Sequence, residues 1–404
     1  MVKLMHIIRS RKQAIYMSCT YIPTLFFCGI LFFKNTSNNP SASAFSGAVA
    51  NRSVNDTITL SIVGDLMCHA PQFVAAQKNN GYDFSFVFEA VKPYLSTSDL
   101  TFGNLETVTA GSEENYSGYP QFNTPAAYLD GLLSAGFDVT TNVNNHSLDR
   151  RFTGIQRTID SLDARKLLHT GTYKNADDTN RVLTVQAKGI SIAVLGYTFS
   201  TNGIPLPTGK EFCVSMIDTA RMRRDVARAQ KTGADKIAVF IHWGNEYERN
   251  PNSNQKSIAN HLANLGVDFI FGSHPHVLQP AEIIQTATKP VFVIYSLGNF
   301  VSAQRKPYTD YGTILRMQLI KDASTGQVRT GKIDFVPTYV SQQKGFRILP
   351  VHEAIAADAK GIQPSFSCTS DDISRMKAIW PEATKHLTNA AIGMQPVTIS
   401  NDGY

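Results

Sequence analysis

Five times along this 404-residue chain, an apolar stretch of strand length is followed at once by polar side chains that can bind a metal ion. In chain order these side chains are Asp65, Glu106, Asn145 with His146, His242, and the pair His274 and His276. Segments of helical length separate several of the strands, and strands that alternate with helices are typical of α/β folds. The carboxyl ends of parallel strands meet at one edge of the sheet, where such folds bind ligands. The sequence therefore predicts an α/β domain with one polar site at that edge.

The strand and helix patterns support this interpretation. We expect strands at 58–63, 100–102, 139–141, 190–195, 237–241, 269–271 and 291–295, and antiparallel strands at 314–319 and 333–336. The predicted helices are 126–135, with Thr124 as N-cap and Pro125 as first helical residue, 219–231 after the N-cap Asp218, and 253–265 before Gly266. A last helix is expected at 371–387, with an apolar face that packs on the domain.

The residue types at the strand ends suit a divalent metal centre. Carboxylate, amide oxygen and neutral imidazole are ligands for ions such as Zn, Mn or Fe. Two such ions about 3.5–4 Å apart can activate water and stabilise a phosphoryl transition state. Each residue alone has a simpler interpretation: Asp65 as a helix cap, Asn145 and His146 as a hydrogen-bonded turn, His242 as a satisfied core histidine. Five strand ends that each carry such side chains, in this order along the chain, favour one shared site.

The N-terminal segment predicts a membrane anchor. Residues 14–33 carry no charge and are long enough to span a bilayer as a helix. Four basic residues precede them, so residues 1–34 would form a cytoplasmic tip and signal anchor, with the domain outside the cell. A cleaved signal peptide is the alternative, because Ala42-Ser43-Ala44 is an A-x-A-like site. Residues 35–56 have the composition of a flexible linker.

Charge and cysteine content exclude two further classes. The formal net charge is +6, but residues 1–34 contribute five positive charges and no acid, so the remainder carries +1. This balance gives no reason to expect nucleic-acid binding by the folded part. Cys68, Cys213 and Cys368 follow no CxxC spacing, so neither a thiolate zinc site nor a disulfide framework is expected, although one disulfide among them stays open.

A set of local motifs resembles the CapA family of capsule and poly-γ-glutamate synthesis proteins. The motifs are Gly64-Asp65-Leu66-Met67, Asn104-Leu105-Glu106, Phe122-Asn123-Thr124-Pro125, Asn144-Asn145-His146-Ser147-Leu148-Asp149, His242-Trp243-Gly244-Asn245-Glu246, Gly272-Ser273-His274-Pro275-His276 and Ser296-Leu297-Gly298-Asn299-Phe300. The resemblance covers about 57–350, which we take as the domain, with 351–404 as a C-terminal extension. It implies a four-layer α/β/β/α sandwich similar to calcineurin-like metallophosphatases.

The resemblance also implies site roles. Asp65, Glu106, Asn145, His242, His274 and His276 would be metal ligands, Glu106 would bridge two ions, and His146 would be the leaving-group acid. The metallophosphatase pattern has Asp-x-His where this chain has Asp65-Leu66-Met67, and a thioether is a poor ligand for such ions. The position near Asp65 and His276 would therefore be weak or empty. His69 could replace the lost ligand or be a solvated loop residue.

Three functions are compatible with these features. The first is an envelope-associated accessory protein of capsule or poly-γ-glutamate synthesis or export, single-pass in the cell membrane and working with a polymer ligase or export complex. The second is an extracytoplasmic metal-dependent hydrolase of phosphoester, γ-glutamyl or peptide bonds. The third is a module that holds an anionic polymer; the basic face at Arg221, Arg223, Arg224 and Arg228 would suit it, although a solvated helix face explains these arginines as well.

Overall fold

The computed structural model describes residues 56–397, and its centre is a pair of β-sheets. The first sheet has the order β16-β15-β14-β1-β4-β5-β6, with β13 beside β1 and β17 beside β15. Its strands are β1 Asp56–Leu66, β4 Leu100–Leu105, β5 Val139–Thr141, β6 Leu168–Thr170, β13 Asn299–Val301, β14 Tyr311–Lys321, β15 Val328–Ser341, β16 Arg347–Pro350 and β17 Gln395–Pro396. Strands β1, β4, β5 and β6 are parallel, and β14 joins β1 in antiparallel register.

The second sheet has the order β11-β12-β10-β9-β8-β7. Its strands are β7 Leu183–Ala187, β8 Ile190–Thr198, β9 Lys236–His242, β10 Phe269–Ser273, β11 Leu278–Gln285 and β12 Pro290–Leu297. The four inner strands are parallel, and the edge strands β7 and β11 are antiparallel to their neighbours. A separate short hairpin consists of β2 Gln77–Lys78 and β3 Gly81–Tyr82.

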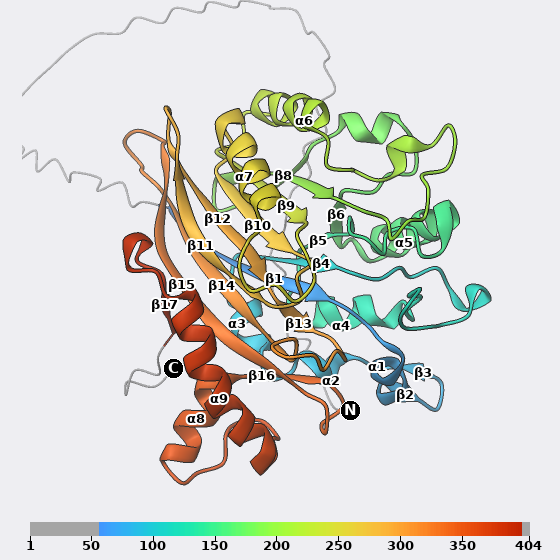
Figure 1. Ribbon diagram of the computed structural model, residues 1–404, viewed down its shortest axis with the longest axis vertical. Helices are drawn as coiled ribbons and strands as arrows, with labels where there is room; N and C mark the ends of the chain where they lie inside the picture. The colour runs from blue at the N-terminus through green and yellow to red at the C-terminus, as the bar shows by residue number, and fades with distance from the viewer. Residues whose placement is uncertain (1–55, 398–404) are drawn as a thin grey trace, which may run out of the picture.

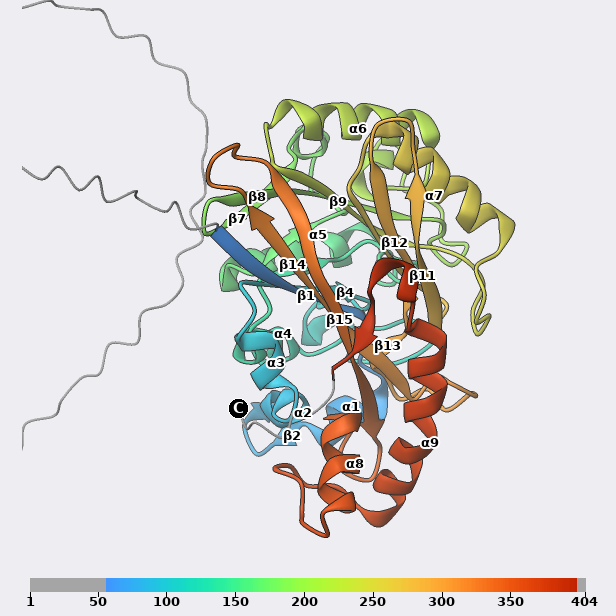
Figure 2. The same cartoon turned by 90° about the vertical axis from the view of Figure 1, so that its left-hand side faces the viewer.

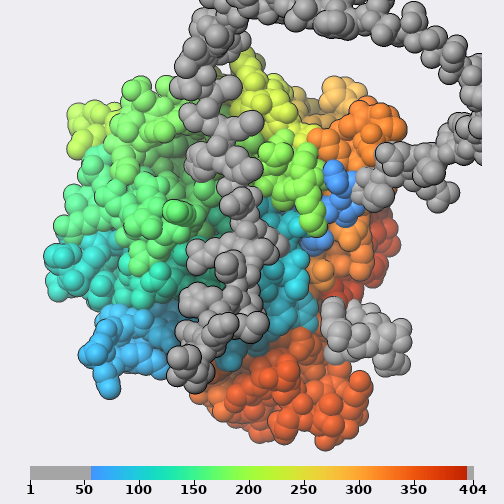
Figure 3. Space-filling model, turned by 180° about the vertical axis from the view of Figure 1, so that it is seen from behind, coloured from blue at the N-terminus to red at the C-terminus, as the bar shows by residue number. Residues whose placement is uncertain are grey.

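Helices flank the pair of sheets (Figure 1). They are α1 Ala70–Ala75, α2 Ser85–Phe88, α3 Lys92–Ser96, α4 Ala127–Ala135, α5 Arg151–Arg165, α6 Thr219–Lys231, α7 Ser253–Leu265, α8 Val351–Ala359 and α9 Ser370–Leu387, with 3-10 turns at Ser112–Glu114, Asp177–Asn180, Glu211–Cys213 and Ala390–Ile392. Seen from behind, the green middle part of the chain lies at the upper left, and orange segments toward the C-terminal end of the chain form the bottom (Figure 3).

Alternation along the strands explains the layers. Ile58 and Leu60 of β1 face a core shared with Phe240 of the second sheet, and the rings of Phe102 and Phe240 stack at 5.5 Å between the two sheets. A second core joins the outer face of the first sheet to α2, α3 and α4, and a third joins the second sheet to α6 and α7. The order is therefore helix, sheet, sheet, helix, as the family resemblance implies.

The predicted elements are present, with one local correction. Asp218 caps α6 by accepting from the Arg221 backbone N–H, and Gly266 ends α7 with φ +97°. Thr124, however, is not a helix cap: α4 begins at Ala127, with Ala126 as N-cap. The hydroxyl of Thr124 instead meets that of Thr107 at 2.7 Å, and both are buried, so this threonine fixes the loop after β4.

The C-terminal segment packs on the domain. Helix α9 runs beside β11 and β15 (Figure 2), and its Met376 and Ile379 lie in the core between the sheets. The predicted anchor at 14–33 and the linker lie outside the described residues. Within 56–397, no helix is both long and apolar enough to cross a bilayer. The three cysteines in this range are free, so the disulfide left open by the sequence does not form among them.

Candidate metal centre

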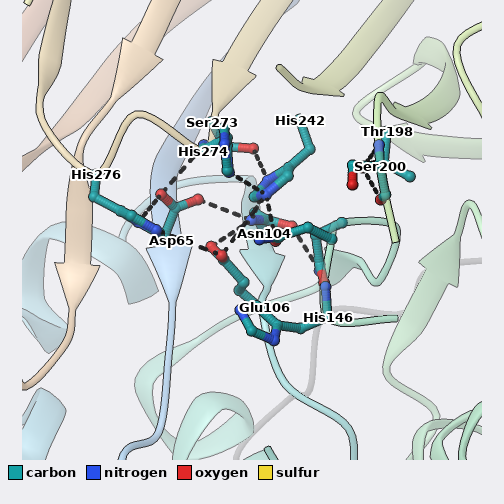
Figure 4. A network of polar contacts seen from close by, with 12 residues as sticks. Asp65, Asn104, Glu106, His146, Thr198, Ser200, His242, Ser273, His274 and His276 are labelled. Atoms are coloured by element: carbon teal, nitrogen blue, oxygen red, sulfur yellow. Dashed lines mark hydrogen bonds and ion pairs between the residues drawn. The ribbon is translucent and has the colours of Figure 1, made fainter. Parts of the chain in front are cut away.

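The strand ends of both sheets meet at one buried cluster (Figure 4). Asp65 comes from β1, Glu106 follows β4, His242 ends β9, and the histidine pair follows β10. Asn145 and His146 lie in the loop between β5 and α5. All seven predicted site residues are at most 4% exposed. The structure therefore brings together every residue that the sequence assigns to the site.

Four of these side chains aim donor atoms at one point. His242 Nε2 lies 2.8 Å from Asn145 Oδ1, 3.1 Å from His274 Nδ1 and 3.7 Å from Glu106 Oε1. One ring N–H can satisfy only one of three acceptors. Ligand atoms bound at about 2.0–2.2 Å to one ion lie roughly 3 Å apart, which matches this spacing. This set leaves out Asp65 and His276, near which the sequence predicts a weak or empty metal position.

Asp65 and His276 form the other half of the cluster. Asp65 Oδ2 and His276 Nδ1 are 3.1 Å apart, and His276 Nε2 is 3.8 Å from Glu106 Oε1. Ligand atoms within 4.8 Å of one another occur in two groups, Glu106 with His274 and His276, and Asp65 with Glu106 and His242. Glu106 belongs to both groups. Its position is therefore the one that a bridging carboxylate needs.

Asn104, which the sequence reasoning did not assign to the site, lies between the two carboxylates. Its Nδ2 donates to Asp65 Oδ1 at 2.8 Å and, over 3.4 Å, to Glu106 Oε2. Its Oδ1 accepts from Asn144 Nδ2 at 3.2 Å, which fixes the orientation of the amide. By donating to both carboxylates, the amide NH₂ group reduces the repulsion between Asp65 and Glu106, which a second metal ion would otherwise have to offset. This contact gives a physical reason, besides Met67, for expecting one strong metal position.

Burial sets the protonation states of the cluster. Burial, reinforced by the neighbouring histidines, lowers the pKa of His242 well below its usual range, and similarly lowers the pKa of His274 to about 3. Both rings are therefore neutral at pH 7, the form that binds metals. Burial and the nearby Asp65 raise the pKa of Glu106. Burial also opposes ionisation of Asp65, but the hydrogen bond and charge of His276 outweigh it and lower the pKa of that carboxyl group.

One unsatisfied atom tests whether these residues fit a metal ion. Glu106 Oε1 is buried and has no hydrogen-bond partner, although two imidazole nitrogens face it at 3.7 and 3.8 Å. A buried acceptor left in this state costs about 1–3 kcal/mol. A cation among the donors would remove that cost and would favour the ionised carboxylate. The residues present therefore fit a divalent metal ion.

His146 lies at the edge of the cluster, where a general acid would be placed. Its Nδ1 is 2.7 Å from Asp149 Oδ2, and its ring meets Phe122 edge-on at 4.6 Å. This contact orients the ring with Nε2 as the free nitrogen. A cleft of about 650 Å³ is lined by both His146 and Asn145, so the cluster is reached from solvent here.

The position of His69 differs from both sequence expectations. It belongs to neither group of closely spaced ligand atoms, and it is half-buried rather than solvated. Its Nδ1 lies 3.1 Å from Gln72 Oε1 and accepts from the Ala303 backbone N–H at 3.3 Å. The ring is therefore held at the start of α1. Met67 is buried, as expected for an apolar side chain that takes the place of a ligand.

Asn202 is a further residue that sequence reasoning missed. It belongs to the loop after β8, its Oδ1 accepts from Asn145 Nδ2 at 3.1 Å, and its Nδ2 lies 3.5 Å from His146 Nδ1. This contact turns Asn145 Oδ1 toward His242. The backbone at Asn202 has a φ of +53°, which asparagine tolerates better than most residues. The residue type is therefore the only sequence signal for this position.

We expect Asn202→Ala to weaken metal binding by about 10-fold, because partners that orient metal ligands typically contribute 10–100-fold. Titration calorimetry with Mn²⁺ or Zn²⁺ measures the change. Asn180→Ala, at an exposed 3-10 turn outside the cluster, is the matched control and should bind as the unmodified protein does. Equal affinity in both variants would show that Asn202 does not position Asn145.

The fold and site together define a class: two-sheet α/β proteins with a buried Asp, Glu, Asn and His cluster that can hold a metal. Within it, the chain belongs to the family described as "Bacterial capsule synthesis protein PGA_cap", which matches residues 59–304. It is 28% identical over 297 residues to the capsule biosynthesis protein CapA of Bacillus anthracis, covering 71% of this chain and 69% of the relative. To the PGA biosynthesis protein CapA of Bacillus subtilis it is 28% identical over 321 residues, covering 76% and 75%.

Similar solved structures are more distant. A Mycoplasma pneumoniae phosphatase has a TM-score of 0.43 and 16% identity, over 70% of this chain and 94% of its own. The NAD nucleotidase of Haemophilus influenzae has a TM-score of 0.44 and 13% identity, over 83% and 64%. At this distance no activity follows from either likeness.

Proposed function

We propose that this protein is an envelope-associated component of capsule or poly-γ-glutamate synthesis or export that binds one divalent metal ion beside a polymer-binding cleft. Family membership supports the pathway. The observation that carries the metal is the unpartnered Glu106 Oε1, faced by imidazole nitrogens. The ion would be Mn, Zn or Fe by its donor set. A polymer ligase or export complex would be the partner, and the ancestral scaffold would be that of a metallophosphatase.

The pathway role is tested in a strain without this gene. We expect loss of surface polymer, measured as released anionic polymer per cell, with full recovery on return of the unmodified gene. The His242→Ala variant should restore little polymer, because His242 contacts three other donors of the cluster. Recovery by this variant, at equal protein level, would show that the cluster is dispensable for the pathway.

The predicted anchor has its own test. Because residues 14–33 are uncharged and basic residues precede them, we expect the full-length protein to fractionate with membranes. Protease added outside spheroplasts should digest the domain. A protein recovered whole from the cytosolic fraction would contradict the proposed location.

A second candidate function is a metal-dependent hydrolase, favoured by the His146–Asp149 contact at the cleft. In that case the ion would supply an activated water, and His146 would hold a proton for the leaving group. The purified full-length protein would then hydrolyse a phosphoester or a γ-glutamyl peptide, and His146→Gln would lower turnover by about 10²–10⁴-fold. Absence of turnover on both substrates would reject the hydrolase function and leave the metal- and polymer-binding role proposed above.

A further inference from the structure

The cleft beside the cluster carries two charged side chains that form no ion pair within residues 56–397. Its volume of about 650 Å³ is within the range of small-molecule sites. Its lining includes the 117–121 loop, Asn202 with Ile204, and Asn145 with His146. Tyr119, which lines the cleft, is 74% exposed. The cleft is therefore open, with room for a ligand of several residues.

Arg150 supplies a positive charge to this cleft. Its guanidinium donates to Ser117 Oγ at 2.6 Å and contacts backbone carbonyls at 3.1–3.5 Å. Among residues 56–397, no carboxylate lies within 4.0 Å of it. The group is held in place by neutral acceptors, so its charge remains available. A carboxylate replacing the longer contacts would form stronger, charge-assisted hydrogen bonds.

Glu246 supplies the opposite charge. It lines the same cleft, is exposed, and follows His242 on the loop after β9. Its contact is the Tyr247 hydroxyl, a neutral group, and within the described range no lysine, arginine or histidine lies within 4.0 Å of it. Asp149 also lines the cleft, but its Oδ2 already contacts His146 Nδ1 and accepts from the Phe122 backbone N–H. Arg150 and Glu246 are therefore the two charged side chains of the lining that have no charged partner within the described residues.

We propose that this cleft binds a ligand that carries both a carboxylate and an ammonium group, the amino-terminal end of a peptide-like chain. The carboxylate lies at Arg150 and the ammonium at Glu246. In a γ-linked glutamate chain, only the amino-terminal residue carries an ammonium group, whereas interior residues carry carboxylates alone. The cleft is therefore a chain-end site rather than a general polyanion track. This inference rests on the proposed function for the identity of the chain.

Paired probes test it with the purified full-length protein. The ligands are γ-glutamylglutamate and its N-acetyl derivative, and titration calorimetry measures their affinities. We expect acetylation to weaken binding by about 10-fold or more, because a hydrogen bond to a charged group contributes about 1.5–3 kcal/mol. Glu246→Gln should weaken the free-amine probe alone, so that both probes then bind equally. Arg150→Gln should weaken both probes by a similar factor.

Controls separate binding from folding. Arg150→Lys keeps the positive charge but cannot donate two parallel hydrogen bonds to a carboxylate. Its affinity for both probes should therefore lie between that of the unmodified protein and that of Arg150→Gln. Arg223→Gln, on an exposed turn of α6, should bind as the unmodified protein does. Equal affinity of the two probes for the unmodified protein, or inorganic phosphate competing with both equally well, would overturn the proposal in favour of a general anion site. Metal content measured in parallel distinguishes the two ideas: absence of metal with intact probe discrimination would reject only the metal centre.

Discussion

Glu106→Gln is expected to remove most of the bound metal while leaving the fold intact. The carboxylate belongs to both groups of closely spaced ligand atoms, and its Oε1 faces His242 and His276. Loss of an orienting partner typically costs 10–100-fold in metal affinity, so loss of a direct ligand should cost at least about 100-fold. Elemental analysis after dialysis gives the metal content per chain.

In metal-free protein, we expect Glu106→Gln to leave the free energy of unfolding unchanged or to raise it, although the same substitution weakens metal binding. Burial and Asp65 raise the pKa of Glu106, so the ionised form is disfavoured in the folded state. A carboxyl group whose pKa rises on folding destabilises the fold progressively as pH increases through its unfolded pKa. Glutamine cannot ionise and has nearly the same shape. We therefore expect the metal-free variant to unfold at an equal or higher denaturant concentration than the metal-free parent at pH 7.

The matched control is Glu282→Gln. Glu282 is exposed on β11 and accepts from the Tyr295 hydroxyl at 2.7 Å, away from the cluster. Glu282→Gln replaces a carboxylate by an amide, as Glu106→Gln does, and should leave the metal content unaltered. If Glu106→Gln retains the metal content of this control, Glu106 is not a ligand, and the unpartnered Oε1 needs another explanation.

The site was predictable to the extent that its residues follow strands. Asp65, Glu106 and His242 each come directly at a strand end, and parallel strands bring such ends to one edge whatever the rest of the chain does. Asn145 and the histidine pair follow strands in the same way, and the family resemblance added the role expected of each residue. Residues that act across the two sheets carry no such signal. Asn202 reaches Asn145 from a loop 57 positions away, through a contact that depends on how the sheets pack.

Two further features show where sequence patterns are insufficient. Thr124 before Pro125 has the pattern of a helix start, but a buried partner hydroxyl on Thr107 competes for its side chain. His69 follows a strand end as the residues of the cluster do, but Gln72 and the Ala303 N–H hold its ring elsewhere. In both cases a tertiary contact, invisible in local sequence, decides which of two reasonable partners a polar side chain takes.

Gly64→Ala is expected to be among the most damaging single-atom additions in the chain. A Cβ at this position would lie 1.9 Å from the carbonyl oxygen of Gly298, which is backbone and cannot rotate away. The same oxygen accepts from the Asp65 N–H at 3.0 Å, and Asp65 pairs with Asn299 of β13. Overpacking a buried site costs about 1–3 kcal/mol and occasionally more, and a rigid backbone contact places this substitution at the upper end.

The comparison with Gly331→Ala makes this test specific. Gly331 lies in β15, where an added Cβ comes closest to the flexible end of the Ile320 side chain at 2.9 Å, so its cost should stay below about 1 kcal/mol. Chemical denaturation of both variants gives the difference in unfolding free energy. Because separation of β1 from Gly298 also moves Asp65, Gly64→Ala should lose metal affinity as well as stability, whereas Gly331→Ala should lose neither. Two variants of equal stability would mean that β1 shifts at little cost, and that Gly64 does not set the position of the Asp65 carboxylate.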